Sequence, residues 1–136
     1  MKSRLKVLVF ALVLTDAGHL ARTLAQGNPD AASVKNPVAA TRESVAAGKA
    51  VYQRRCASCH GADGSGGAGN DLIGPAPSLV DETWDHGSTD GEIFSVIKNG
   101  VPPDFMMVPW KDDLKDDEIW NVVNYLRSLA KDAKTP

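Results

Sequence analysis

Residues 56–60 read CASCH, and this stretch holds both cysteines of the 136-residue chain, directly before one of its three histidines. The segment that follows, 61–74, is rich in glycine and fits neither a stable helix nor a strand. We therefore expect a loop there, and a long one for a small domain. Loops of this kind are usually functional or wrapped around another group.

Three segments outside this loop have helical patterns. The segment 43–56, ESVAAGKAVYQRRC, spaces its apolar and small residues as a helix does and predicts a helix that ends close to the cysteines. The segment 88–100, STDGEIFSVIKNG, predicts a short helix, because Thr89 and Glu92 have the spacing of a capping box and Asn99-Gly100 can end it.

The segment 116–131 predicts the clearest helix, with acidic residues in its first turn and Lys131 near its end. Its apolar stripe recurs every three or four residues. The stripe consists of Ile119, Val122, Val123, Leu126 and Leu129.

No alternating strand pattern follows the N-terminal segment, so the sequence predicts an all-α domain with long loops. A second loop at 101–110, VPPDFMMVPW, is stiffened by three prolines. Roughly 90 residues with such loops and few large aliphatic side chains make a thin core, and small domains are marginally stable without a staple. We expect another group to fill the middle.

The N-terminal residues are typical of an export signal. A basic start, a short apolar run (Val7–Leu14) and a polar, small-residue stretch predict a signal peptide over 1–25, cleaved after Ala25 or alternatively after Ala17. The apolar run is far shorter than the roughly 20 residues that span a bilayer. An uncleaved anchor, the alternative, would have to include the polar residues that follow the run.

The rest of the chain divides into three expected parts. Residues 26–42 are low in large apolar side chains and broken by two prolines, so they predict a flexible leader. The domain itself is expected at 43–132, with a short tail at 133–136.

Export changes the charge balance of the chain. Without residues 1–25, 11 of the 15 basic and 16 of the 17 acidic side chains remain, which gives a net charge of −5. So acidic a chain has no electrostatic footprint for nucleic acid.

Several chemistries compete for the CASCH motif. A thioredoxin-like dithiol needs parallel strands that the sequence lacks. Structural zinc needs two further ligands, but His60 follows Cys59 too closely for the usual spacing, and His86 is the only other histidine beyond the signal. A disulfide between residues three apart would close too small a loop to stabilise much. The remaining chemistry is covalent c-type haem attachment, for which C-x-x-C-H is the recognised signature.

Haem attachment explains the spacing of the motif. Two thiols about one helical turn apart can each add to a vinyl group on one porphyrin edge, and the next residue can point its imidazole at the iron. Export agrees, because c-type haem is attached outside the cytoplasm, and a haem would fill the thin core. We therefore predict one covalent haem c and its iron, held by Cys56, Cys59 and His60.

With this motif, residues 46–130 resemble the small class I (mono-haem) c-type cytochromes. GKAVYQRRCASCHGADGSGG resembles the family's first helix and haem-binding segment, and IGPAPSLVDETW resembles the loop below the haem. The resemblance implies a cytochrome c fold of about three to five helices wrapped around the haem.

The resemblance also implies roles for single residues. The Pro75 carbonyl would accept a hydrogen bond from the second ring nitrogen of His60 and fix its tautomer. Trp84 would pack near the haem edge or propionates, or else be a plain core aromatic. Tyr125 would cross the first helix near Gly48.

The sixth iron ligand is expected in the proline-bounded loop, whose Met106 and Met107 match the family's axial-methionine loop. Successive side chains of an extended segment point to opposite sides, so only one can reach the iron. The family's ligand is usually followed by proline, whereas here Pro109 comes one place later. Counting back from Trp110 favours Met107, and Met106 is the alternative.

Ligation by histidine and methionine leaves no coordination site for a substrate and raises the reduction potential relative to two nitrogen ligands. We therefore expect a periplasmic electron carrier rather than an enzyme. It would shuttle single electrons between a dehydrogenase or membrane complex and a terminal oxidase or reductase.

Other functions remain open from the sequence. A close variant is a haem subunit of such a complex, tethered by the leader. A five-coordinate haem sensor or peroxidase would need both methionines to leave the iron. Arg54 and Arg55, just before Cys56, form either a small basic patch for a partner or a solvated helix end.

Overall fold

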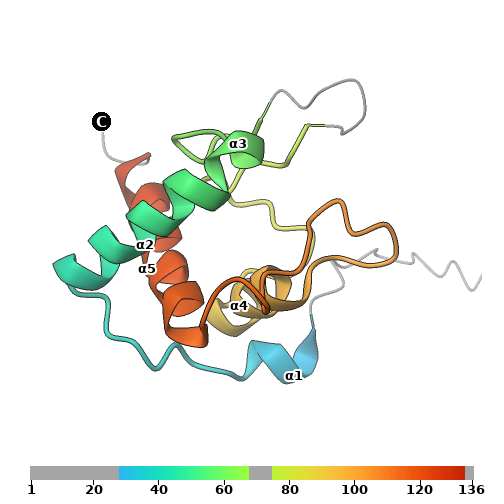
Figure 1. Cartoon of the computed structure of the whole chain (residues 1–136), viewed down its shortest axis with the longest axis horizontal. Helices are drawn as coiled ribbons and strands as arrows, with labels where there is room; N and C mark the ends of the chain where they lie inside the picture. Colours follow the sequence, from blue (N-terminus) through green and yellow to red (C-terminus); the bar gives the residue numbers. More distant parts are fainter. Residues whose placement is uncertain (1–27, 68–74, 134–136) are drawn as a thin grey trace, which may run out of the picture.

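The computed structural model describes residues 28–67 and 75–133 (Figure 1). Its helices are α1 (Pro29–Ala32), α2 (Arg42–Arg55), α3 (Ala57–His60), α4 (Asp90–Asn99) and α5 (Asp116–Asp132). No strand occurs within these described ranges, and the predicted all-α class is confirmed.

The crossing of α2 and α5 organises the fold (Figure 1). Gly48 lets the two backbones approach closely, because a Cβ at this position would lie 1.9 Å from the backbone oxygen of Asn121. One turn later, the ring of Tyr52 meets that of Tyr125 edge to face, with centroids 5.3 Å apart. Tyr125 thus crosses α2 near Gly48, as the resemblance implied.

The apolar stripe of α5 forms the centre of the core. Ile119, Val122, Val123 and Leu126 are buried, and they pack with residues of α2 and α4 in one cluster. Between α4 and α5, Phe94 stacks on Trp120 with ring centroids 4.0 Å apart.

The ends of α4 follow the sequence expectation. Thr89 and Glu92 form a reciprocal capping box at the start of the helix. Gly100 ends the helix with φ +70°, a backbone conformation that favours glycine.

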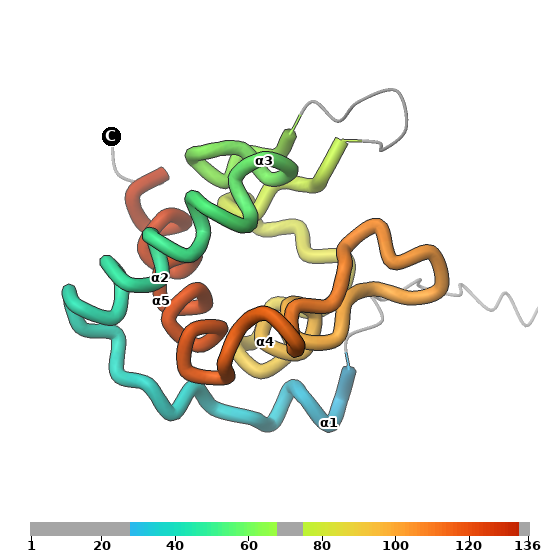
Figure 2. Tube along the Cα trace, in the orientation of Figure 1, coloured from blue at the N-terminus to red at the C-terminus, as the bar shows by residue number. Residues whose placement is uncertain are grey.

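The segment before α2 differs from the flexible leader that we predicted. Over residues 28–41, which we call the strap, the chain runs along one edge of the molecule from α1 to α2 (Figure 2). The Nδ2 amide of Asn36 donates to Oδ1 of Asn124 (2.9 Å) and to the carbonyl of Trp120 (3.3 Å). Asn124 in turn donates from its own Nδ2 to the carbonyl of Val38 (3.0 Å).

The strap also packs on α4 through α1. Gly91 leaves room for this contact, because a Cβ there would lie 2.0 Å from the carbonyl oxygen of Ala31. Hydrogen bonds and close backbone packing thus connect this segment to α4 and α5, although it has few large apolar side chains.

The predicted signal peptide (1–25) lies outside the described residues, as does the predicted C-terminal tail (133–136) except for Ala133. Within those ranges, no helix is both long and apolar enough to cross a membrane.

Candidate haem site

An apolar cavity of about 530 Å³ lies between α3, α4, the segment 75–87 and the loop 101–110. This volume is within the range of roughly 300–1,000 Å³ typical of small-molecule and cofactor sites. Every site residue predicted from the sequence lines this cavity. These residues are Cys56, Cys59, His60, Pro75, Trp84, Met106 and Met107.

The CASCH motif forms a tight turn at the end of α2. The carbonyl of Cys56 accepts hydrogen bonds from the amides of Cys59 (3.1 Å) and His60 (3.0 Å), which makes α3 a single helical turn. Both thiols are free. Burial raises the pKa of the Cys56 thiol to about 11, so this side chain is a neutral thiol near neutral pH.

The imidazole of His60 is in a state that can bind a metal ion. Burial lowers its pKa, and the Pro77 carbonyl opposes this effect. The ring is therefore neutral near neutral pH, which is the form that binds metals. Its Nδ1 atom is buried and has no hydrogen-bond partner among the described residues.

The resemblance implied a contact from the Pro75 carbonyl to His60. Pro75 lines the same cavity, and the carbonyl that raises the pKa of His60 is that of Pro77. The amide of Leu79 donates to the Gly64 carbonyl (2.8 Å), and the Leu79 side chain packs against the core.

The loop 101–110 forms the wall opposite to α3 and places its two methionines differently. Met106 is 50% exposed at the mouth of the cavity, whereas Met107 is half-buried and packs against the core. The carbonyl of Met107 accepts from the amide of Val101 (2.9 Å), which closes the loop on itself. The structure therefore favours Met107 as the inward-facing side chain, as the count along the sequence did.

Trp84 lines the cavity and also packs against the core cluster. Other residues line the cavity that sequence reasoning did not assign to the site, and Arg55 and Trp110 are among them. The position of Arg55 beside Cys56 was a signal that could have identified it.

The residues present fit a covalently bound haem. The cavity is predominantly apolar, two free thiols lie at one edge, and a neutral imidazole lines the same space. The ring also carries a buried nitrogen without a partner, which a haem-ligating histidine would direct to a nearby carbonyl such as that of Pro77.

Comparison with known proteins agrees with this site. The family model described as cytochrome C oxidase, cbb3-type, subunit III matches residues 43–126. The cbb3-type cytochrome c oxidase subunit FixP of Bradyrhizobium diazoefficiens is 35% identical over 114 residues, covering 78% of this chain and 37% of that protein. Subunit CcoP of Azospirillum brasilense is 31% identical over 99 residues, covering 65% of this chain and 32% of that protein.

The chain thus spans about a third of the length of the curated relatives it matches. Among solved structures, cytochrome cL of Methylophaga aminisulfidivorans superposes with a TM-score of 0.53 at 25% identity, over 64% of this chain and 53% of that one. The class I cytochrome c fold, a covalently bound haem c and an electron-transfer role are therefore established for this domain. The chain belongs to the family of cbb3-type cytochrome c oxidase subunit III domains.

Proposed function

We propose that this chain transfers single electrons in the periplasm through a haem c with His60 and Met107 as axial ligands. It would take electrons from a dehydrogenase or membrane complex and pass them to a terminal acceptor. The observation that carries this proposal is that His60 and the inward-facing Met107 line one apolar cavity from different segments. The signal peptide predicted at 1–25 supports the periplasmic location.

Each residue of the site has a defined task in this function. Cys56 and Cys59 would hold the haem through thioether bonds, and His60 and Met107 would bind its iron. The apolar lining keeps water away from the cofactor, which when bound supplies a one-electron Fe(II)/Fe(III) couple. Residues of α2, α4 and α5 line the same cavity, and these helices would hold both ligand-bearing segments in place.

The relatives favour a second form of the same function. The curated proteins similar to this chain are subunits of cbb3-type oxidases. The chain would then pass electrons within such a complex rather than diffuse between partners. Purification from native membranes after mild detergent separates the two forms, because a subunit copurifies with oxidase activity and a free carrier does not.

Visible absorption spectra of the haem-loaded protein test the ligation. We expect a sharp c-type reduced spectrum, a weak long-wavelength Met–Fe(III) band, and no change when carbon monoxide is added. Met107→Ala should abolish the Met–Fe(III) band and permit carbon monoxide binding, whereas the neighbouring Met106→Ala should leave both unchanged. The reverse pattern would make Met106 the ligand, and a wild-type spectrum that shifts with carbon monoxide would refute the carrier function.

A further inference from the structure

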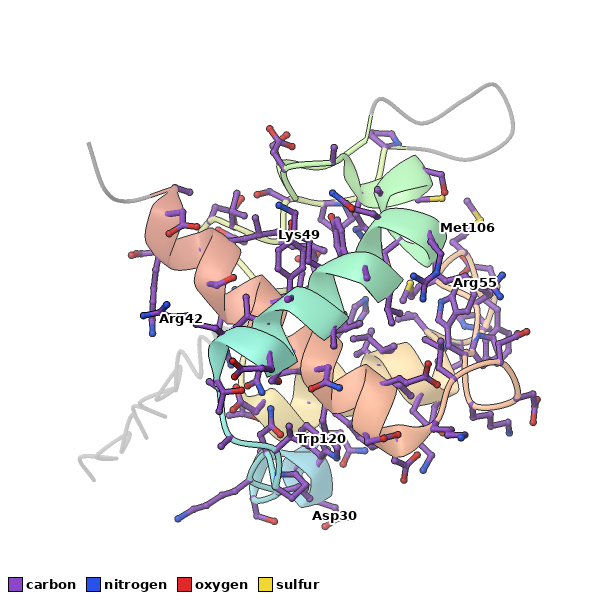
Figure 3. All side chains as sticks on the ribbon, turned by 60° about the vertical axis from the view of Figure 1, so that its left-hand side comes forward. Asp30, Arg42, Lys49, Arg55, Met106 and Trp120 are labelled. Carbon is purple, nitrogen blue, oxygen red and sulfur yellow. The ribbon has the colours of Figure 1, made fainter. Side chains whose placement is uncertain are left out.

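Arg55 reaches from one wall of the cavity to the other. It is the last residue of α2, directly before Cys56, and both it and Trp110 line the cavity. Its guanidinium carbon lies 5.9 Å from the centroid of the Trp110 ring, within the range of a cation–π contact. Figure 3 shows Arg55 on the side of the molecule where Met106 lies.

Trp110 is held in place by its own backbone hydrogen bonds and side-chain packing. Its amide donates to the carbonyl of Ile97 (3.1 Å), its carbonyl accepts from the amide of Leu114 (2.9 Å), and its side chain packs against the core. It also lies only three residues after Met107. A contact that holds Trp110 therefore acts on the part of the loop that presents the inward-facing methionine.

The neighbouring Arg54 provides an internal comparison. Successive residues of a helix point about 100° apart, so Arg54 and Arg55 share charge and position in the chain but not direction. Both side chains are exposed, yet only Arg55 lines the cavity and lies over an aromatic ring. The basic pair considered from the sequence thus divides into two residues with different surroundings.

We propose that Arg55 is a positioning residue that holds the loop 101–110 against the haem-attachment turn by stacking on Trp110. We call this contact the Arg55–Trp110 latch. It resists the opening of the loop, and so keeps Met107 in place. This inference rests on the ligation proposed above and adds a residue to it that belongs to neither the attachment motif nor the axial pair.

The magnitude of the effect follows from the exposure of the contact. An exposed cation–π pair contributes about 0.5–1 kcal/mol, which corresponds to a roughly two- to fivefold change in an equilibrium constant. Loss of the latch should therefore raise the open fraction of the loop by this factor and leave the fold intact.

Imidazole binding to the oxidised, haem-loaded protein measures the open fraction, because imidazole takes the iron only when methionine has left. Arg55→Gln should increase the apparent imidazole affinity about two- to fivefold. Arg54→Gln, which removes the same charge from the adjacent position, should bind imidazole as the wild type does. Equal effects of the two variants would show a general charge effect and overturn the latch, as would no effect of Arg55→Gln.

A double-mutant cycle tests the contact itself. If Arg55 acts through Trp110, Arg55→Gln should change imidazole affinity no further in the Trp110→Leu background. Persistence of the full effect in that background would overturn the proposal.

Amide hydrogen exchange provides a readout that does not depend on which residue binds the iron. The amide of Val101 donates to the Met107 carbonyl within the loop, and the amide of Trp110 donates to the Ile97 carbonyl in α4. Their exchange should accelerate in Arg55→Gln by the same factor as imidazole binding and stay unchanged in Arg54→Gln. A wild-type spectrum without the Met–Fe(III) band would refute the ligation alone, whereas unchanged exchange in Arg55→Gln would refute the latch.

Discussion

At the scale of single residues, the two methionines of the loop show how one step along the chain changes the chemistry of a side chain. Met106 exposes half of its surface, whereas Met107 packs against the core. Thioether sulfur is oxidised to the sulfoxide according to its accessibility. The two sulfur atoms should therefore react with peroxide at different rates.

Dilute hydrogen peroxide should convert Met106 to the sulfoxide several-fold faster than Met107. Peptide mapping by mass spectrometry at increasing times measures both rates in the same sample. Met106→Leu serves as the control and should show little early oxidation of the loop. Early oxidation of Met107 in the wild type would mean that it is the exposed residue.

The residues of the attachment motif could be predicted because they lie within five consecutive positions of the sequence. Cys56, Cys59 and His60 fall in one helical turn, and the cavity contains all three. The effect of the Pro77 carbonyl on the pKa of His60 could not be predicted, because it depends on how the chain folds and not on spacing in the sequence. A count of residues along a loop does not contain that information.

At the scale of elements, α2, α4 and α5 follow from periodicity and capping signals in the sequence. The short helices α1 and α3 do not, because a single turn has no period to detect. α1 begins instead at Asn28, whose side-chain oxygen accepts from the amides of Asp30 and Ala31. Such local hydrogen bonds can form without any periodic pattern of apolar residues in the sequence.

The crossing of α2 and α5 predicts a large effect of a small change. Gly48→Ala would place a Cβ 1.9 Å from the backbone oxygen of Asn121, so the helices must separate. Overpacking of this kind should lower the free energy of unfolding by about 2 kcal/mol or more, despite the better helix propensity of alanine. Guanidinium denaturation of the haem-loaded protein measures it. The control Ala50→Gly, at an exposed position of α2, should cost only about 1 kcal/mol.

The start of α4 predicts a smaller effect. Thr89→Ala removes the hydroxyl that accepts from the amide of Glu92, and should lower the free energy of unfolding by about 1 kcal/mol. Denaturation curves of Thr89→Ala and of the exposed neighbour Ser88→Ala provide the comparison. Equal stabilities of the two variants would show that the capping box contributes nothing measurable.

At the scale of the whole molecule, the strap makes the structured unit longer than the predicted domain. Its hydrogen bonds join residues that are more than 80 positions apart in the sequence, such as Asn36 and Asn124. The sequence predicted flexibility there because low apolar content usually means too little burial to order a segment. Hydrogen bonds from a few polar side chains to α5 order the segment instead, and a single sequence does not show which polar residues will form such bonds.

Loss of the strap should weaken the molecule without changing its haem environment. Asn36→Ala removes two hydrogen bonds to α5, and should lower the free energy of unfolding by about 1–2 kcal/mol. Lys35→Ala, at the exposed preceding position, should have no effect. Visible spectra of both variants should match the wild type, and an unchanged stability of Asn36→Ala would restore the flexible leader.

Both ends of the methionine loop are tied to the C-terminal end of α4. The amides of Trp110 and Lys111 donate to the carbonyls of Ile97 and Lys98, and Gly100 ends the helix where the loop begins. Insertions and substitutions at the exposed loop positions 102–106 therefore need not disturb the packing of α2 on α5. Over evolutionary time the axial ligand and the redox tuning of such a domain can diverge while its helical scaffold is conserved.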